Sequence, residues 1–317
     1  MSTPGSASDS ASDSASDSAP AEAGNGPPSS VRALMSGAID YAGLFPPASL
    51  TMADAVQNFA RYRRGPNAWM LGRFVLPVAR LEELAEAFAA VAQGEADPWP
   101  LSVIARASDA AALAAFNGRY GARLRIDTVE APPVRKGEVA DLAPLAATYS
   151  VFAEVDWASD PAPVINELAT FGVRAKIRTG GVKADAFPTA SQVARFIVAC
   201  RAAHVPFKAT AGLHHAWRGD YPLTYEPGSA RATMYGFANV LLASAAALAG
   251  ADEAELVVVL SAGDAAKFEA ADQGWVLPSG RALPSELVMA ARGEAMASFG
   301  SCSFEEPLEE LTAQGLL

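Results

Sequence analysis

The segments VRAKIRTGG (173–181), FPTASQVARFIVACRAAH (187–204) and VPFKATAGLHH (205–215) decide the fold of this chain. They place a helix of ordinary length between two short apolar runs, each with one lysine and a glycine turn at its end. A strand, a helix and a second strand at this spacing form a parallel βαβ unit, because a parallel crossover needs a dozen or more residues. We therefore expect Lys176 and Lys208 near the carboxyl ends of two neighbouring parallel strands.

The same alternation of strands and helices runs through the chain before this segment. Alternation of this kind gives a parallel sheet, either a closed (β/α)8 barrel or an open doubly wound sheet. The first predicted strand is not followed by GxGxxG and the chain has no P-loop motif, which disfavours the open nucleotide-binding sheet. The predicted fold class is therefore α/β, a single (β/α)8 TIM-type barrel. Its first five strands are predicted at residues 38–45, 69–76, 101–105, 124–129 and 151–157.

The eighth strand, predicted at residues 298–303, is separated from the seventh by an insertion at about residues 216–297. Long insertions in compact folds are often functional, so we expect this one to form a lid over the barrel mouth. It is predicted to contain a long apolar helix at 230–248, a helix or strand at 255–260, a hairpin at 275–283 and a helix at 285–296.

Composition limits the classes of function that this chain can have. Residues 1–30 repeat Ala-Ser-Asp-Ser and are predicted to be a disordered acidic tail, which leaves residues 31–317 for the barrel. The formal net charge of −11 argues against a nucleic-acid partner, because phosphate binding needs a basic surface. Cys200 and Cys302 lie far apart and are expected to be reduced thiols.

Neither a secretory signal nor a membrane span is evident, since the most apolar run, at residues 237–249, is short for a span. We expect a soluble, cytoplasmic protein with a small-molecule carbonyl substrate and no membrane partner, which could form a homo-oligomer.

The two lysines are the first candidates for chemistry. The two-residue period of a strand puts Lys176 and Arg178 on one face of one strand, and Lys208 and Thr210 on one face of the next. Cations within short apolar strands are uncommon, because burying an unpaired charge is costly. Two lysines buried near each other repel, so one can lose its proton near neutral pH and act as a nucleophile toward a carbonyl.

Carboxylates within the predicted strands could serve as partners of these cations. Asp127 lies within RIDTVE, and Glu154 and Asp156 alternate within FAEVDW. They would supply counter-charges, together with a proton acceptor and donor, or they would be structural ion pairs inside the barrel. Asp40, near the end of the first strand, could also line the mouth.

Two further motifs lie where strands end. His214 and His215 could form hydrogen bonds to a substrate or, with other ligands, bind a metal, although the chain has no HxH, HExxH or cysteine cluster. The turn that contains Gly300, Ser301 and Ser303 could hold an anion with its backbone amides, as in many such barrels, or could be only a tight turn.

These motifs resemble class I, Schiff-base aldolases of the deoxyribose-phosphate aldolase type. The family's strand-six motif, Lys-Thr-Ser-Thr-Gly, is similar to Lys-Ile-Arg-Thr-Gly at 176–180, and its Phe-Lys-x-x-Gly-Gly is similar to Phe-Lys-Ala-Thr-Ala-Gly at 207–212. Its strand-four aspartate is matched by Asp127 and its strand-five glutamate by Glu154. A Phe-Gly-Ala-Ser-Ser-like turn resembles residues 299–303.

The resemblance implies that Lys176 is the Schiff-base lysine, that Lys208 lowers its pKa and that Asp127 relays protons through water. Glu154 would hold this network, and no cofactor or metal would be required. Arg178, Thr179 and Thr210, together with His214, His215, Gly300, Ser301 and Ser303, would contact the substrate. Arg178, Ala211 and His214 depart from the family's motifs, so the substrate, and whether it is phosphorylated, stays open.

The sequence thus predicts a carbon–carbon lyase, aldolase-like, that forms an imine at Lys176 with a small carbonyl compound, such as a sugar or sugar phosphate. One alternative is a metal-assisted barrel hydrolase or lyase that uses His214, His215, Glu154 and Asp156. The other is a non-catalytic barrel that binds a small acidic metabolite through Arg178 and the two lysines.

Overall fold

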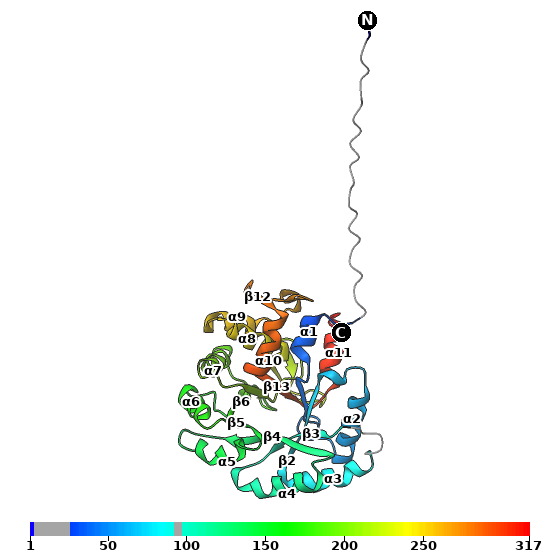
Figure 1. The fold of residues 1–317 in the computed structure, drawn as a ribbon, viewed down its shortest axis with the longest axis vertical. Helices are drawn as coiled ribbons and strands as arrows, with labels where there is room; N and C mark the ends of the chain where they lie inside the picture. Colours follow the sequence, from blue (N-terminus) through cyan, green and yellow to red (C-terminus); the bar gives the residue numbers. More distant parts are fainter. Residues whose placement is uncertain (3–25, 92–96) are drawn as a thin grey trace.

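The predicted (β/α)8 barrel is confirmed by the computed structural model, which describes residues 1–2, 26–91 and 97–317. Within these residues, eight parallel strands close into a barrel in the order β1-β13-β7-β6-β5-β4-β3-β2 (Figure 1). All eight predicted strands are present, with ends that differ by a few residues. They are β1 (Ile39–Tyr41), β2 (Leu71–Pro77), β3 (Trp99–Ile104), β4 (Leu124–Pro133), β5 (Ser150–Glu154), β6 (Arg174–Arg178), β7 (Phe207–Thr210) and β13 (Met296–Ser301).

Helices surround the barrel and bury their apolar faces against it (Figure 1). Between β1 and β3, for example, the Phe59 ring meets those of Phe74 and Trp99 edge to face, with centroid distances of 5.4 Å and 4.8 Å. The helices outside the insertion are α1 (Ser29–Met35), α2 (Met52–Arg64), α3 (Leu81–Ala89), α4 (Ala110–Tyr120), α5 (Ala143–Ala146), α6 (Ala162–Thr170), α7 (Ala190–Ala202) and α11 (Glu305–Ala313).

The unit formed by β6, α7 and β7 has the predicted arrangement. The two strands pair in parallel, with Lys176 opposite Lys208 in the register. Helix α7 turns an apolar face inward, and the Phe196 ring packs edge-on against Phe207 at 5.2 Å between centroids. The two lysines are therefore neighbours on adjacent strands.

Two strands differ from the prediction in ways that move candidate residues. The register between β3 and β4 shifts where Leu101 pairs with Ile126 and Ser102 pairs with Thr128, so Asp127 is an extra residue, as in a β-bulge. Strand β5 ends at Glu154, so Asp156 lies in the following turn and not on the strand face that carries Glu154. The alternation of side chains between the two faces of a strand does not hold at either place, because a bulge interrupts β4 and β5 ends before Asp156.

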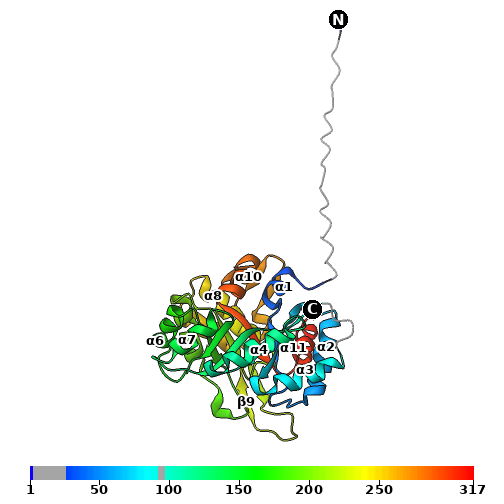
Figure 2. The same cartoon turned by 60° about the horizontal axis from the view of Figure 1, so that its bottom comes forward.

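The insertion divides into parts that lie on different sides of the barrel (Figure 2). The predicted helix at 230–248 begins only at 237, because residues 231–234 pair in a hairpin. The helix at 253–261, the 275–283 hairpin and the helix at 285–294 follow the prediction. The parts are β8 (Gly219–Pro222), β9 (Arg231–Met234), α8 (Phe237–Leu248), α9 (Glu253–Ser261), β10 (Glu269–Ala271), β11 (Gly274–Val276), β12 (Ala282–Pro284) and α10 (Ser285–Glu294).

Helix α8 belongs to the barrel wall and is buried along nearly its whole length. Its Asn239 joins two neighbours: the side-chain Nδ2 donates to the carbonyl oxygens of Val259 and Ala262, both at 2.8 Å, and Oδ1 accepts from the Arg218 backbone N–H at 2.8 Å. Asn239 therefore fixes the base of the β8–β9 hairpin. In the described parts of the chain, α8 included, no helix has both the length and the apolarity to cross a membrane.

The structure describes only residues 1–2 and 26–30 of the predicted tail. Helix α1 begins at Ser29, so it includes Ser29 and Ser30, the last two residues of the predicted tail. The Ser30 carbonyl accepts a hydrogen bond from the Trp275 indole N–H at 3.2 Å. The tail boundary at residue 30 is therefore wrong by at least two residues. Residues 3–25 of the predicted tail lie outside the described residues.

The capping box of α7 provides a test of the βαβ unit. Thr189 Oγ1 accepts from the Gln192 N–H at 3.3 Å, and Gln192 Oε1 accepts from the Thr189 N–H at 2.8 Å. We expect Thr189→Ala to lower the free energy of unfolding by about 1 kcal/mol, because the cap hydroxyl satisfies an otherwise unpaired amide. Thr189→Ser keeps the hydroxyl and should retain most of the stability. Equal losses for both variants in urea titrations would contradict this role.

Candidate active site

A cluster of buried charges lies inside the barrel and is centred on Lys208. Its Nζ lies 2.7 Å from Asp40 Oδ2 and 2.6 Å from Glu130 Oε1, and the residue is fully buried. Hydroxyl groups complete the shell, since Ser298 Oγ donates to Asp40 at 2.6 Å and Ser102 Oγ donates to Glu130 at 2.8 Å. Buried charges are tolerated when they are paired and hydrogen-bonded in this way.

Lys176 shares one of these carboxylates but has a different environment. Its Nζ lies 3.5 Å from Glu130 Oε2 and 3.2 Å from Glu154 Oε2. Lys176 is 5% exposed and lines a cavity, whereas Lys208 is 0% exposed and does not. Glu130 thus bridges two lysines, of which only Lys176 faces a space that a ligand can occupy.

The pKa values of the cluster follow from burial opposed by opposite charge. Burial favours the neutral form of Glu130, but the charges of Lys208 and Lys176 outweigh it and lower the Glu130 pKa to about 2. Burial likewise favours neutral Lys208, but Asp40 and Glu130 outweigh it and raise the Lys208 pKa. Lys208 therefore stays an ammonium ion and Glu130 stays a carboxylate at neutral pH.

Asp127, the expected proton relay, does not join this cluster. Its carboxylate accepts from Arg73 Nε at 2.6 Å and from Arg73 Nη2 at 3.2 Å, and Thr128 Oγ1 donates to it at 2.8 Å. Glu130, three residues later in β4, occupies the position between the lysines. The available signal in the sequence was a carboxylate within the apolar run TVEAP (128–132).

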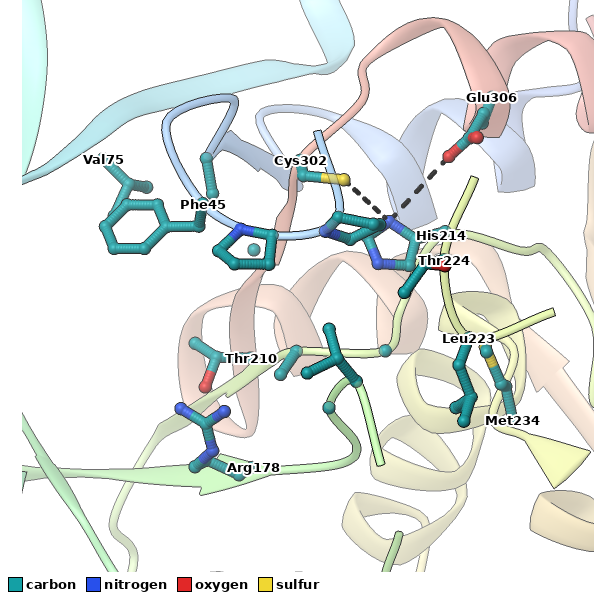
Figure 3. A pocket seen from close by; sticks show the side chains of 18 of the residues that line it. Phe45, Val75, Arg178, Thr210, His214, Leu223, Thr224, Met234, Cys302 and Glu306 are labelled. Atoms are coloured by element: carbon teal, nitrogen blue, oxygen red, sulfur yellow. Dashed lines mark hydrogen bonds and ion pairs between the residues drawn. The ribbon is translucent and has the colours of Figure 1, made fainter. Parts of the chain in front are cut away.

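The cavity has a volume of about 390 Å³ and lies at the carboxyl ends of the strands (Figure 3). The turn after β1, the ends of β6, β7 and β13, and the loop of the β8–β9 hairpin enclose it. Among the insertion residues, those that line it belong to the hairpin, so the expectation that residues 216–297 as a whole form the lid is wrong. Many of its walls are apolar: Phe45, Pro46, Pro47, Val75, Ile104, Val182, Leu223 and Met234.

Of the predicted substrate contacts on β6 and β7, Arg178 and Thr210 line the cavity (Figure 3). In the described parts of the chain, the Arg178 side chain has no hydrogen bond or ion pair, although its residue is exposed at the mouth. Thr179 instead supports the next turn, because its hydroxyl donates at 2.8 Å to the carbonyl of Ala211, whose backbone is left-handed (φ 62°). Thr179 is buried and does not line the cavity.

His214 lies at the other end of the cavity from Arg178 (Figure 3). Its Nδ1 is 3.5 Å from Cys302 Sγ and 3.8 Å from Glu306 Oε2. Burial, with a smaller effect of His215, lowers the His214 pKa to about 4, so the imidazole is neutral at pH 7. Burial raises the pKa values of Cys302 and Glu306. The raised pKa of Cys302 disfavours its thiolate form, so this end of the cavity does not present an activated thiolate.

The four side chains of the metal alternative do not share one site. His215 pairs through Nδ1 with Glu310 and stacks on Tyr221, while Asp156 accepts from the Ala158 N–H and from Ser159 Oγ in its own turn. Glu154 contacts Lys176. Over residues 1–2, 26–91 and 97–317, no group of three or more His, Cys, Asp and Glu side chains is placed to hold a metal ion.

Two backbone amides at the predicted anion-binding turn are already hydrogen-bonded within it. The Ser303 N–H donates to Ser301 Oγ at 3.3 Å, and the Glu306 N–H donates to Ser303 Oγ at 3.1 Å. Gly300 lines the cavity, but Ser301 and Ser303 do not. Because the Glu306 carboxylate also lies at this end of the cavity, the turn is poorly suited to a phosphate group.

Comparisons with known proteins add little to this geometry. No protein-family model matches the chain, and no curated protein matches it. A lysine/ornithine decarboxylase from Vibrio vulnificus, solved in complex with cadaverine, is similar over 57% of this chain and 48% of that chain, with 10% identity and a TM-score of 0.34. The chain spans about half the length of that structure, and a similarity at this level carries no argument about activity.

The buried cluster predicts a large effect when one cation is removed. Lys208→Met leaves Asp40 and Glu130 buried with too little positive charge, so we expect the free energy of unfolding to fall by about 3–5 kcal/mol. Lys183→Met, at an exposed position after β6, should change it by less than about 0.5 kcal/mol. Urea unfolding of the two variants measures this difference. Similar small losses in both would show that the cluster is not a stabilising unit.

Glu130 also predicts a pH dependence. A carboxylate whose pKa falls from 4.5 to about 2 on folding stabilises the protein above about pH 4.5, and this stabilisation is lost as the pH falls toward 2. We expect the unfolding free energy of Glu130→Gln to decline less steeply over this range than that of the unchanged protein. The exposed Glu294→Gln variant serves as the control. Parallel declines for all three proteins would contradict the depressed pKa of Glu130.

Proposed function

We propose that this chain is a class I, aldolase-like carbon–carbon lyase in which Lys176 forms an imine with a small carbonyl compound. One observation carries the proposal: Lys176 lines the cavity with its Nζ within 3.5 Å of two carboxylates, while the neighbouring Lys208 is fully buried and does not line it. An amine nucleophile needs a nearby base and access to a substrate. Lys176 has both.

The carboxylates beside Lys176 can manage the protons of imine formation. As the lysine ammonium gives up a proton to Glu154 or Glu130, the free amine adds to the substrate carbonyl carbon and forms a carbinolamine. The carbinolamine hydroxyl then leaves as water and the nitrogen forms a protonated imine, so two of the three ammonium protons end on the departing water. Glu154 is the closer of the two carboxylates, at 3.2 Å from Nζ against 3.5 Å for Glu130, and is therefore the better placed to move them.

The protonated imine then withdraws electrons from the substrate. The bond between the α and β carbons breaks as the β hydroxyl loses its proton and becomes a carbonyl. The electron pair of that bond leaves an enamine, which regains a proton on carbon, and water hydrolyses the imine to release the second product. These steps need no group beyond the substrate, water and the residues of the site.

The structure supports a revised distribution of roles within this proposal. Glu130, and not Asp127, takes the place of the strand-four carboxylate. Lys208 keeps Glu130 ionised through a 2.6 Å contact, so its main effect is on the carboxylate and not directly on the Lys176 amine. Lys208 is therefore a positioning residue.

Borohydride trapping tests the proposal. The full chain would be incubated with a panel of small aldehydes and ketones plus borohydride, and the adducts mapped by intact mass and peptide mass spectrometry. We expect one adduct on Lys176, absent in Lys176→Met and unchanged in Lys183→Met, whose lysine is exposed. Adducts that persist in Lys176→Met would indicate non-specific labelling and would contradict the proposal.

A non-catalytic binding barrel is the second candidate, because carboxylates within 3.5 Å hold Lys176 and Lys208 in ion pairs. It predicts that small acids raise the unfolding temperature although no carbonyl compound leaves an adduct on Lys176. The same panel, read by thermal unfolding, separates the two candidates.

A further inference from the structure

Arg178 is a cation of the cavity whose charge is not balanced by a carboxylate among the described residues. The buried cluster pairs Lys176 and Lys208 with Asp40, Glu130 and Glu154 and leaves no excess of positive charge. Arg178, two residues after Lys176 on the same face of β6, has no hydrogen bond or ion pair within the described residues. A guanidinium group can bind a carboxylate or a phosphate with two hydrogen bonds, so Arg178 marks a position for an anionic group of the ligand.

The end of the cavity opposite Arg178 carries a carboxylate in place of a cation. Glu306 and the neutral His214 lie there, far from Arg178 in the close view of the cavity (Figure 3). A second negative charge on the ligand would meet the Glu306 carboxylate. At the turn after Gly300, the Ser303 amide is already bonded to Ser301 Oγ and is not available to an anion. The charge distribution therefore suits one anionic group, on the Arg178 side.

Between these ends most of the lining side chains are apolar, although Thr210, Thr224 and Tyr225 also line the cavity. Phe45, Val75 and Ile104 come from the barrel strands and the turn after β1, and Leu223 and Met234 come from the β8–β9 hairpin. A sugar phosphate carries several hydroxyl groups, each of which needs a hydrogen-bond partner once it is buried. These apolar side chains supply none. They match a hydrocarbon group, whose transfer from water is favourable.

We infer that the substrate is an oxo acid that carries the β hydroxyl needed for cleavage and is otherwise apolar, bound with its carbonyl at Lys176, its carboxylate at Arg178 and its hydrocarbon part against the hairpin. This inference rests on the proposed imine chemistry and narrows its substrate class. Successive residues on one strand face are about 7 Å apart, so a carbonyl and a carboxylate in one small molecule can reach both side chains.

The test compares four carbonyl probes by the concentration of each that gives half-maximal borohydride trapping at Lys176. The probes are 4-methyl-2-oxopentanoate, pyruvate, 4-methyl-2-pentanone and glyceraldehyde 3-phosphate. We expect 4-methyl-2-oxopentanoate to saturate at a concentration at least about tenfold below that of the other three, because pyruvate lacks the hydrocarbon part and the ketone lacks the carboxylate.

Variants then assign the two contacts. Arg178→Met should raise the half-saturating concentration of 4-methyl-2-oxopentanoate on the order of tenfold or more and leave that of 4-methyl-2-pentanone unchanged. Arg195→Met, at an exposed position of α7, is the matched control and should change neither. Leu223→Ser should reduce the preference for 4-methyl-2-oxopentanoate over pyruvate several-fold.

The outcomes separate this inference from the proposal on which it rests. Trapping at Lys176 that favours glyceraldehyde 3-phosphate, or that is insensitive to Arg178→Met with every acid, overturns the substrate class and leaves the imine chemistry standing. No adduct at Lys176 with any of the four probes or with the wider aldehyde and ketone panel overturns both.

Discussion

The shared carboxylate of Glu130 is the contact on which the interior of this barrel depends. Parallel pairing of β6 and β7 brings Lys176 and Lys208 opposite each other, and Glu130 reaches both, at 3.5 Å and 2.6 Å. Two ammonium groups this close would repel in a medium that screens charge poorly, and a lone buried carboxylate would be equally costly. Each charge is tolerated only in the presence of the others. Removal of one of them therefore destabilises the whole cluster.

The same cluster makes two chemically identical side chains unequal. Lys208 lies between Asp40 and Glu130, with hydroxyl groups around them and no access to the cavity. Lys176 lies on the neighbouring strand, where it contacts Glu154 and lines the cavity. Burial therefore separates the roles of the two lysines. Lys208 neutralises the buried carboxylates, and Lys176 can contact a ligand in the cavity. This asymmetry supports imine chemistry at Lys176 more strongly than the presence of two lysines alone.

The mouth of the barrel is formed by other residues than those of the buried cluster. The β8–β9 hairpin closes over the strand ends, and its base is fixed by Asn239, which joins the Arg218 amide to the end of α9. Gly236 is required at this junction, since a Cβ there would lie 2.2 Å from the Ala216 carbonyl oxygen. The hairpin contributes apolar walls, whereas Arg178 and Glu306 set opposite charges at the two ends of the cavity.

The sequence by itself determined the barrel, its eight strands and the positions of Lys176, Lys208 and Arg178, because strand and helix periods are local properties of the chain. It could not determine that Glu130, and not Asp127, lies between the lysines, since a bulge in β4 changes which side chains face inward. Nor could it separate the hairpin lid from the rest of the insertion, or place Glu306 near His214. These features arise from contacts between residues far apart in the chain, and no local period encodes such contacts.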